Sequence, residues 1–303
     1  MGSRNRRHCF EGNRWIVTPS RWAVAFLFLG FIPMAHGEGI VVSTSPSFVF
    51  QWREEPVPPF AVGESIRYII KYGLIPAGFA TLEVVSTETV AGRPTYRILS
   101  EAKTNKGMDV VFKVRDTNES WIDAESLCSL QFRQDIREGR YTRRVETTYD
   151  HPGRRFLYKK WRKGNESVQE GAIPPFVHDV LSSLYYIRTR PLEVGKDFTM
   201  DANSGATTWP LSVHVRAREQ IKVPAGTFDC FHLEPVLAGD GIFQASGRLE
   251  VWVTVDPPHI PVLLRSRVMV GAFDAEMTEF RPGPVPDPSV ESIAPPSPEM
   301  GAR

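Results

Sequence analysis

The sequence is poor in the residues that mark a disulfide-rich or membrane-embedded protein. Its 303 residues include three cysteines, and the longest mostly apolar run, Trp22 to Met34, covers 13 residues. A membrane-spanning helix needs about 20 apolar residues, so this run is short for an anchor. The formal net charge is +1. A chain with such balanced charge has no electrostatic reason to bind nucleic acid.

Catalytic and phosphate-binding motifs are also missing. The sequence contains no Gly-x-Ser-x-Gly string and no glycine-rich phosphate loop, which argues against a hydrolase of the nucleophile-elbow type. His178-Asp179 and Cys230-x-His232 carry residue types used in acid–base chemistry and metal binding, but the partners that such sites need are missing. Asp179 is better explained as a helix cap or as first-turn negative charge. We therefore expect no cofactor and no metal.

The N-terminus has the layout of a secretory signal peptide. Five arginines stand against one acidic residue in the first 21 positions, the apolar run follows, and Ala35-His36-Gly37 supplies small residues for cleavage. We predict a signal peptide over residues 1–37 and an exported, periplasmic protein. If this segment stayed uncleaved, it would supply the membrane contact of an otherwise soluble chain.

Export would place Cys128 and Cys230 in an oxidising compartment. A disulfide between them would close a loop of about 100 residues, which chain-entropy models value at roughly 4–5 kcal/mol. Two buried free thiols fit the sequence equally well, because pairing depends on the Cα separation. Both alternatives stay open at this point.

The chain divides into four segments by composition. Residues 38–57 follow the signal peptide and read as an extended linker, and residues 282–303 form a proline-rich tail that we expect to be disordered. The folded domain then covers residues 58–281.

Within this domain, short alternating runs predict strands and one pattern predicts a main helix. Ala80–Val84 and Leu211–Arg216 alternate apolar and polar residues, as strands with one buried face do. Apolar residues recur at helical spacing over Val177–Arg188, and a second, short helix is expected over Asn105–Phe112. The sequence thus predicts a mainly β fold, namely a single curved antiparallel sheet or incomplete β barrel with one main helix against its concave face.

Two similar strings predict tight hairpin turns. Pro76-Ala77-Gly78 and Pro224-Ala225-Gly226 both lie between strand-like runs. Proline presets the first turn position and glycine accepts the positive φ that follows. We expect one hairpin at each string.

Several strings together resemble the family of domains of unknown function numbered 3108. They are Val62-Gly63-Glu64, Tyr68, Ala77-Gly78, Asp179-x-Leu181-Ser182-Ser183-x-Tyr185, Arg188-x-x-Pro191-Leu192-x-x-Gly195, Val223-Pro224-Ala225-Gly226-Thr227-Phe228 and Leu249-x-x-Trp252-x-x-x-Asp256. The resemblance covers about residues 60–280. It implies an exported protein of a Gram-negative bacterium whose fold is similar to that of periplasmic lipoprotein carriers, in which a curved barrel holds apolar ligands under a helical lid. It brings no catalytic residues, and it implies Ser182 as a hydrogen-bond link from helix to sheet.

The first functional hypothesis is therefore a non-catalytic binding or carrier module for a lipid or another apolar envelope molecule. Bulky side chains would line its concave face, although an ordinary filled core remains the alternative. The candidate ligand-binding residues are Trp121, Trp252, Phe112, Phe243, Leu181, Leu184 and Tyr185.

Two other hypotheses come from different classes of protein. One is a structural or interaction protein of the envelope with a filled core and a protein partner. The other is a hydrolase of an envelope polymer, which would need Glu219, Asp256, Arg265 and His178 to converge in one cleft.

Overall fold

A computed structural model describes residues 50–237, 248–268 and 270–284, and they form one 14-stranded antiparallel sheet with two helices. The predicted fold class is confirmed. The elements are β1 (Ser65–Tyr72), β2 (Ile75–Val90), β3 (Arg93–Thr104), α1 (Lys106–Val111), β4 (Arg115–Asp123), β5 (Ser129–Glu138), β6 (Tyr141–Asp150), β7 (Arg155–Arg162), β8 (Asn165–Ala172), α2 (Val180–Ile187), β9 (Phe198–Ser204), β10 (Thr207–Val223), β11 (Gly226–Leu237), β12 (Arg248–Thr254), β13 (Pro261–Arg267) and β14 (Ala272–Arg281).

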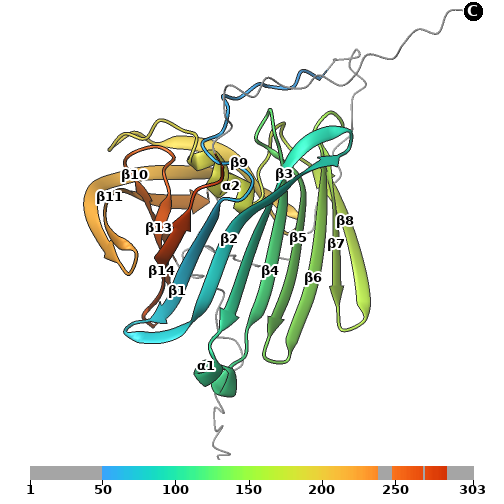
Figure 1. Cartoon of the computed structure of the whole chain (residues 1–303). Helices are drawn as coiled ribbons and strands as arrows, with labels where there is room; N and C mark the ends of the chain where they lie inside the picture. The colour runs from blue at the N-terminus through green and yellow to red at the C-terminus, as the bar shows by residue number, and fades with distance from the viewer. Residues whose placement is uncertain (1–49, 238–247, 269, 285–303) are drawn as a thin grey trace, which may run out of the picture.

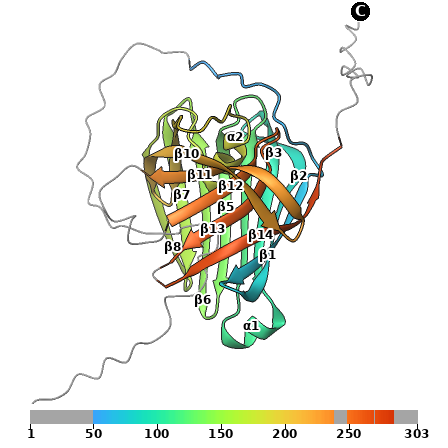
Figure 2. The same cartoon turned by 90° about the vertical axis from the view of Figure 1, so that its left-hand side faces the viewer.

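The sheet consists of two meanders, and the first strand of the chain, β1, pairs with the last strand, β14, at the centre of the sheet. The strand order runs from β8 to β1 and then from β14 to β9, so that β1 pairs with both β2 and β14. The edges are therefore β8 and β9, and the sheet does not close into a barrel. It is strongly curved (Figure 1), and β10–β14 cross in front of β4–β7 in the view of Figure 2.

Helix α2 lies against the concave face at one end of this sheet (Figure 1). It is shorter than predicted, because Asp179 caps it and the chain before the cap is extended. His178 instead forms a parallel bridge with Ala202 of β9, while the carbonyl of Val177 accepts a hydrogen bond from the Ser129 amide of β5. This short segment links the edge strand β9 to the far half of the sheet. We call the face that carries α2 the concave face and the opposite face the outer face.

The concave face differs between the two halves of the sheet. On β1, β2 and β11–β14 it is apolar and forms the main core, together with Leu181 and Tyr185 of α2. On β3–β6 it also carries many buried polar side chains, whereas β6 and β7 contribute a second, smaller apolar cluster. These buried polar residues are Ser100, Asp116, Asn118, Ser120, Gln134, Arg143 and Thr147.

The opposite end of the sheet carries α1 (Figure 1). Asn105 caps this helix by accepting from the Met108 amide, as the predicted range of 105–112 implied. The turns of the β1–β2, β5–β6 and β13–β14 hairpins lie at the same end. We call this end, with α1 and the three turns, the loop end.

The two Pro-Ala-Gly strings behave differently. Pro224 and Ala225 form the turn between β10 and β11, as predicted. The prediction for Pro76-Ala77-Gly78 is wrong, because the β1–β2 turn lies earlier, at Gly73 and Leu74, and the string continues β2. Gly78 is needed there for another reason. A Cβ atom at Gly78 would collide with the backbone carbonyl of Lys103 in β3.

Residues 50–57, within the predicted linker, are extended and contact the folded body. Arg53 lies between the rings of Phe176 and Tyr186, 4.7 Å from each centroid, and Arg93 lies 3.9 Å from the ring centroid of Trp52. The predicted signal peptide, residues 38–49 and nearly all of the predicted tail lie outside the described residues. In the described part, neither helix is long and apolar enough to cross a membrane.

Candidate functional site

Both predicted ligand-binding tryptophans lie on the outer face. Trp121 follows Ser120, which reaches α2 on the concave face, and successive side chains of a strand alternate between faces. Its Nε1 donates to Glu88 at 2.7 Å. Trp252 donates to Glu219 at 2.6 Å and stacks on His232, with ring centroids 4.4 Å apart.

The other predicted lining residues are dispersed. Leu181 and Tyr185 are buried in the main core, and Leu184 is half-buried against it. Phe112 follows α1 at the loop end, where it contacts Gly139, while Phe243 lies outside the described residues. The structure therefore does not bring the predicted set together into one site.

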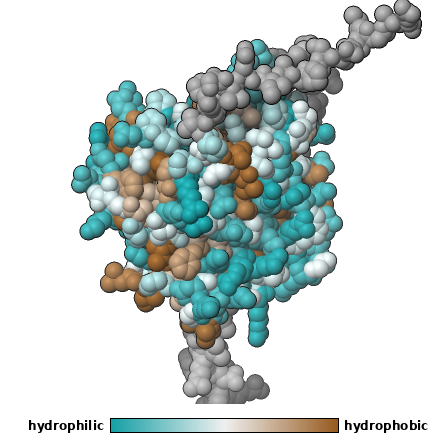
Figure 3. Space-filling view, in the orientation of Figure 1, coloured by the Kyte–Doolittle hydropathy of each residue, from teal (hydrophilic) through white to brown (hydrophobic). Residues whose placement is uncertain are grey.

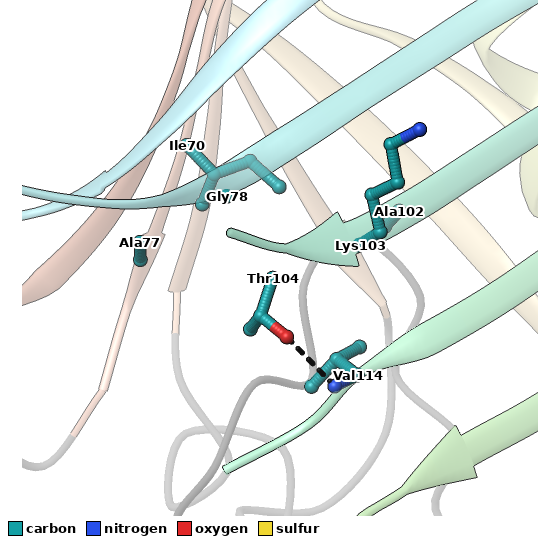
Figure 4. A pocket seen from close by; sticks show the side chains of 7 residues that line it. All are labelled: Ile70, Ala77, Gly78, Ala102, Lys103, Thr104 and Val114. Atoms are coloured by element: carbon teal, nitrogen blue, oxygen red, sulfur yellow. Dashed lines mark hydrogen bonds between the residues drawn. The ribbon is translucent and has the colours of Figure 1, made fainter. Parts of the chain in front are cut away.

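A small pocket lies near the loop end (Figure 4). Its volume is about 10 Å³, roughly the space of one water molecule. The lining residues are Ile70, Ala77, Gly78, Ala102, Lys103, Thr104 and Val114. A pocket of this size does not hold an acyl chain.

The ionisable residues considered for hydrolysis do not converge. Glu219 and Arg265 both contact Trp252 on the outer face, where Arg265 also forms a bidentate ion pair with Asp274. Asp256 is exposed in the turn after β12. His178 is buried beside Arg53 and Tyr186 instead, and burial lowers its pKa well below the usual value. No group of three metal-ligating side chains occurs among the described residues.

The two cysteines of the folded domain are buried and unbridged in the described structure. Burial raises the pKa of both thiols, and that of Cys230 rises to about 12. Neither thiol is therefore poised as a nucleophile at neutral pH.

The carboxylate of Asp179 joins α2 to the sheet. One oxygen accepts from the amides of Leu181 and Ser182, and the other accepts from the hydroxyls of Ser120 at 2.6 Å and Ser129 at 2.5 Å. Ser182, which the resemblance suggested for this link, donates within its own helix to the Asp179 carbonyl. Burial raises the pKa of Asp179, whereas these hydrogen bonds lower it. The cap is thus a structural device, as the sequence indicated.

Sequence reasoning missed a group of exposed apolar side chains at the loop end. Figure 3 shows apolar atoms standing out along this lower edge of the molecule. The exposed fractions are 96% for Leu74, 88% for Val110, 77% for Val111, 71% for Val270 and 61% for Ile75. The signal in the sequence was bulky apolar residues at turns, where polar residues are usual.

Hydrogen bonds hold these loops next to one another. The Tyr72 hydroxyl donates to the Val270 carbonyl at 2.7 Å, which ties the β1–β2 turn to the β13–β14 turn. The Asn105 side chain donates to the Pro76 carbonyl at 2.7 Å, which ties α1 to β2. The exposed apolar side chains are therefore one feature, which we call the apolar rim (Leu74, Ile75, Val110, Val111 and Val270).

Exposed basic side chains lie at the same loop end as the apolar rim. Lys103, Lys106, Lys113 and Arg140 lie in or beside its loops and are exposed, and none of them forms an ion pair with a described residue. The acidic residue of α1, Asp109, is already paired with Arg115 at 2.6 Å. The loop end thus combines exposed apolar surface with unneutralised positive charge.

A family model and two solved structures are similar to this chain. A family model described as "Protein of unknown function (DUF3108)" matches residues 67–278. The crystal structure of a β-barrel-like protein of the domain of unknown function DUF1849 from Brucella abortus is similar in fold. It has a TM-score of 0.50 and 8% identity, and the match covers 75% of this chain and 100% of that one. A Bacteroides fragilis protein with a YmcC-like fold has a TM-score of 0.28 and 10% identity over 74% and 98% of the two chains. No curated protein matches.

Proposed function

The chain belongs to the DUF3108 family, and we propose that it is a non-catalytic module of the cell envelope that docks on an anionic membrane surface through its apolar rim. The observation that carries this proposal is the exposure of Leu74, Val110, Val111 and Val270 at one end of the molecule. Soluble proteins rarely leave several large apolar side chains together in water, and such groups mark interaction surfaces.

The shape of the rim fits a bilayer. Its side chains come from separate turns and a one-and-a-half-turn helix that stand at the end of the sheet, rather than from a groove. Short apolar side chains at such positions can enter the boundary between headgroups and acyl chains while the sheet stays outside.

The positive charge at the loop end supports an anionic surface. Lys106 and Lys113 flank α1, and each basic residue near such a membrane contributes about 1 kcal/mol of attraction. The free energies of apolar insertion and of charge attraction add, and stable membrane binding commonly combines two such contributions.

This proposal shares with the interaction-protein hypothesis an exposed apolar surface, but its partner is a lipid surface and not a protein. It differs from the expectation that membrane contact would come through the N-terminal segment. The carrier hypothesis receives less support, because its predicted lining residues do not come together in one site. Periplasmic localisation rests on the signal-like N-terminus and is part of the proposal.

Vesicle sedimentation tests the docking proposal. The protein is expressed with its own N-terminus, recovered from the periplasmic fraction, and its actual first residue is determined by mass spectrometry. It is then mixed with phosphatidylcholine vesicles that contain or lack phosphatidylglycerol. We expect binding that requires phosphatidylglycerol and weakens with salt.

A triple variant and a matched control make the test specific. Leu74→Ser, Val110→Ser and Val111→Ser together should reduce vesicle partitioning at least about tenfold. The control replaces three other exposed valines, Val57, Val168 and Val194, by serine and should bind as the wild type does. Equal binding by the rim variant and the wild type, or no binding by the wild type, would refute the proposal.

A further inference from the structure

A buried guanidinium lies among the polar side chains of the concave face, close to the loop end. Arg143 is 7% exposed. In β6, residues 143, 145, 147 and 149 are buried and alternate with more exposed ones, so Arg143 shares the concave face. It pairs with Ile136 of β5, two residue pairs from the end of the β5–β6 hairpin.

Most hydrogen-bond donors of Arg143 are unused by the described residues. Its Nη2 donates to Oε1 of Gln134, whose Nε2 in turn donates to Oδ1 of Asn118 at 2.8 Å. Its buried Nε has no hydrogen-bond partner among the described residues, and none of their carboxylate oxygens lies within 4.0 Å of the guanidinium. A buried arginine ordinarily forms a close ion pair, because an isolated buried charge is costly.

Two carboxyl groups, those of Asp116 and Glu138, interact electrostatically with Arg143 without forming an ion pair within 4.0 Å. Asp116 and Glu138 hydrogen-bond to one another, and Asp116 Oδ1 also accepts from the Arg137 amide at 2.9 Å. Burial raises the pKa of Asp116 to about 6, and burial together with the charge of Asp116 raises that of Glu138 to about 8. At neutral pH the pair therefore carries close to one negative charge, which acts on Arg143 at longer range while the Nε donor stays without a hydrogen-bond partner among the described residues.

The surroundings of Arg143 are apolar on one side. Val145 follows it on the same face, and Tyr158 packs with Val145 in a small cluster. On the other side, Asp116 pairs with Ala102, which lines the small pocket of Figure 4. A polar anchor thus adjoins apolar side chains on the concave face, near the loop end.

We propose that Arg143 anchors a binding site for an amphiphile with an oxyanion group, either a carboxylate or a phosphate ester. The Nε and Nη groups of arginine form a planar fork that matches two oxygens of such a group. Gln134 and Asn118 hold the guanidinium in place, and the apolar part of the ligand lies along Val145. Because Arg143 is 7% exposed, the ligand reaches it by displacing neighbouring side chains. The site is distinct from the apolar rim, so failure of vesicle docking would leave this proposal standing.

Calorimetric titration of the processed protein with three probes tests the site. The probes are dodecanoate, dodecyl phosphate and inorganic phosphate, with the first two below their micelle concentrations. We expect saturable binding of at least one amphiphile, and the stronger of the two identifies the oxyanion. Binding of inorganic phosphate as tight as that of dodecyl phosphate would overturn the amphiphile assignment.

Adjacent arginines supply the matched variants. Arg143→Gln should weaken amphiphile binding at least about tenfold, because it removes the charged fork. Arg144→Gln, on the outer face beside Glu146, should change it less than about twofold. Unchanged binding by a folded Arg143→Gln protein, or no binding of either amphiphile by the wild type, would refute the site.

A second variant keeps the test decisive if Arg143→Gln fails to fold. Glu138→Gln removes a negative charge near Arg143 and keeps a side chain of the same shape. Anion binding by this variant should be as tight as in the wild type or tighter, above all above pH 8, where Glu138 is otherwise ionised. Weaker binding by the folded variant would contradict the proposed role of Arg143.

Discussion

Arg188 and Glu64 form a bidentate ion pair that is almost completely removed from solvent. Nη1 donates to Oε1 at 2.6 Å and Nη2 donates to Oε2 at 2.8 Å, with side-chain exposures of 0% and 2%. The guanidinium also lies 4.9 Å from the ring centroid of Tyr185 and 5.5 Å from that of Phe60. The pair joins the residue that ends α2 to the start of β1 across the core.

Breaking this pair should be strongly destabilising. Glu64→Gln leaves the buried Arg188 without its counter-charge, and we expect a loss of about 3–5 kcal/mol in the free energy of unfolding by denaturant titration. The double variant Glu64→Leu with Arg188→Met should lose less than Arg188→Met with Glu64 intact. Nearly additive losses would show that the pair is not coupled.

The cap of α2 gives a graded prediction. Asp179→Ala removes the acceptor of two amides and two serine hydroxyls, and it should cost about 2 kcal/mol or more. Asp179→Asn keeps a capping oxygen and should fall between this variant and the wild type. Thermal unfolding ranks the three proteins, and faster amide exchange at Leu181 and Ser182 would locate the effect. Equal stability of all three proteins would show that the Asp179 cap does not stabilise the fold.

Gly78 should tolerate no side chain. Gly78→Ala forces β2 away from β3, because the added methyl group meets the Lys103 carbonyl, and we expect a loss of about 1–3 kcal/mol. Gly107→Ala in α1 is the control, since its new methyl group meets only the Asn105 side chain at 3.4 Å, and alanine favours helix. Similar melting temperatures for Gly78→Ala and the wild type would contradict the close approach of the strands.

The carboxyl pair predicts that stability falls as pH rises. Asp116 and Glu138 bind protons more tightly in the folded state, since their pKa values rise to about 6 and about 8 from 3.8 and 4.5. The stability that they contribute is complete below the unfolded pKa values and is lost as pH passes through 6 and 8. Between pH 6.5 and 9, the melting temperature should fall in the wild type and fall less in Glu138→Gln. Parallel curves for the two proteins would contradict this linkage.

Alkylation distinguishes the two alternatives for the cysteines. If Cys128 and Cys230 are buried free thiols with raised pKa values, iodoacetamide at pH 8 should leave both unmodified in the native protein. Both should react in denaturant without reductant. Peptide mapping reads the two sites separately, and a requirement for reductant before labelling would reveal a disulfide.

Much of the fold was predictable because local rules and tertiary packing agree. Apolar periodicity placed α2 to within three residues at its start, and Asp179 limits it as a cap. Alternation marked Leu211–Arg216 correctly within β10. Turn rules based on local sequence failed where a turn-like string is required for strand packing instead. Pro76-Ala77-Gly78 resembles a turn, but Gly78 is required by the neighbouring strand.

The site was less predictable, because alternation does not tell which face of a strand is inside. Trp121 and Trp252 were expected on the concave face, yet both lie outside, where arginines cover their rings. Arg133 lies 5.0 Å from the ring centroid of Trp121, and Arg265 lies 5.4 Å from that of Trp252. Cation–π contacts of this kind let an outer face bury large aromatic side chains. The apolar rim was not predicted, because bulky apolar residues were assumed to be buried.

The pairing of β1 with β14 affects the order in which the strands can pair during folding. Arg67 and Glu279, which meet across these strands, are 212 positions apart. During synthesis, β1 therefore finds β2 early but waits for almost the whole domain before its second neighbour arrives. The central seam of the sheet closes last, and such distant pairings form slowly. Under the export that we propose, this delay would leave the chain more time to cross the membrane before the sheet is complete.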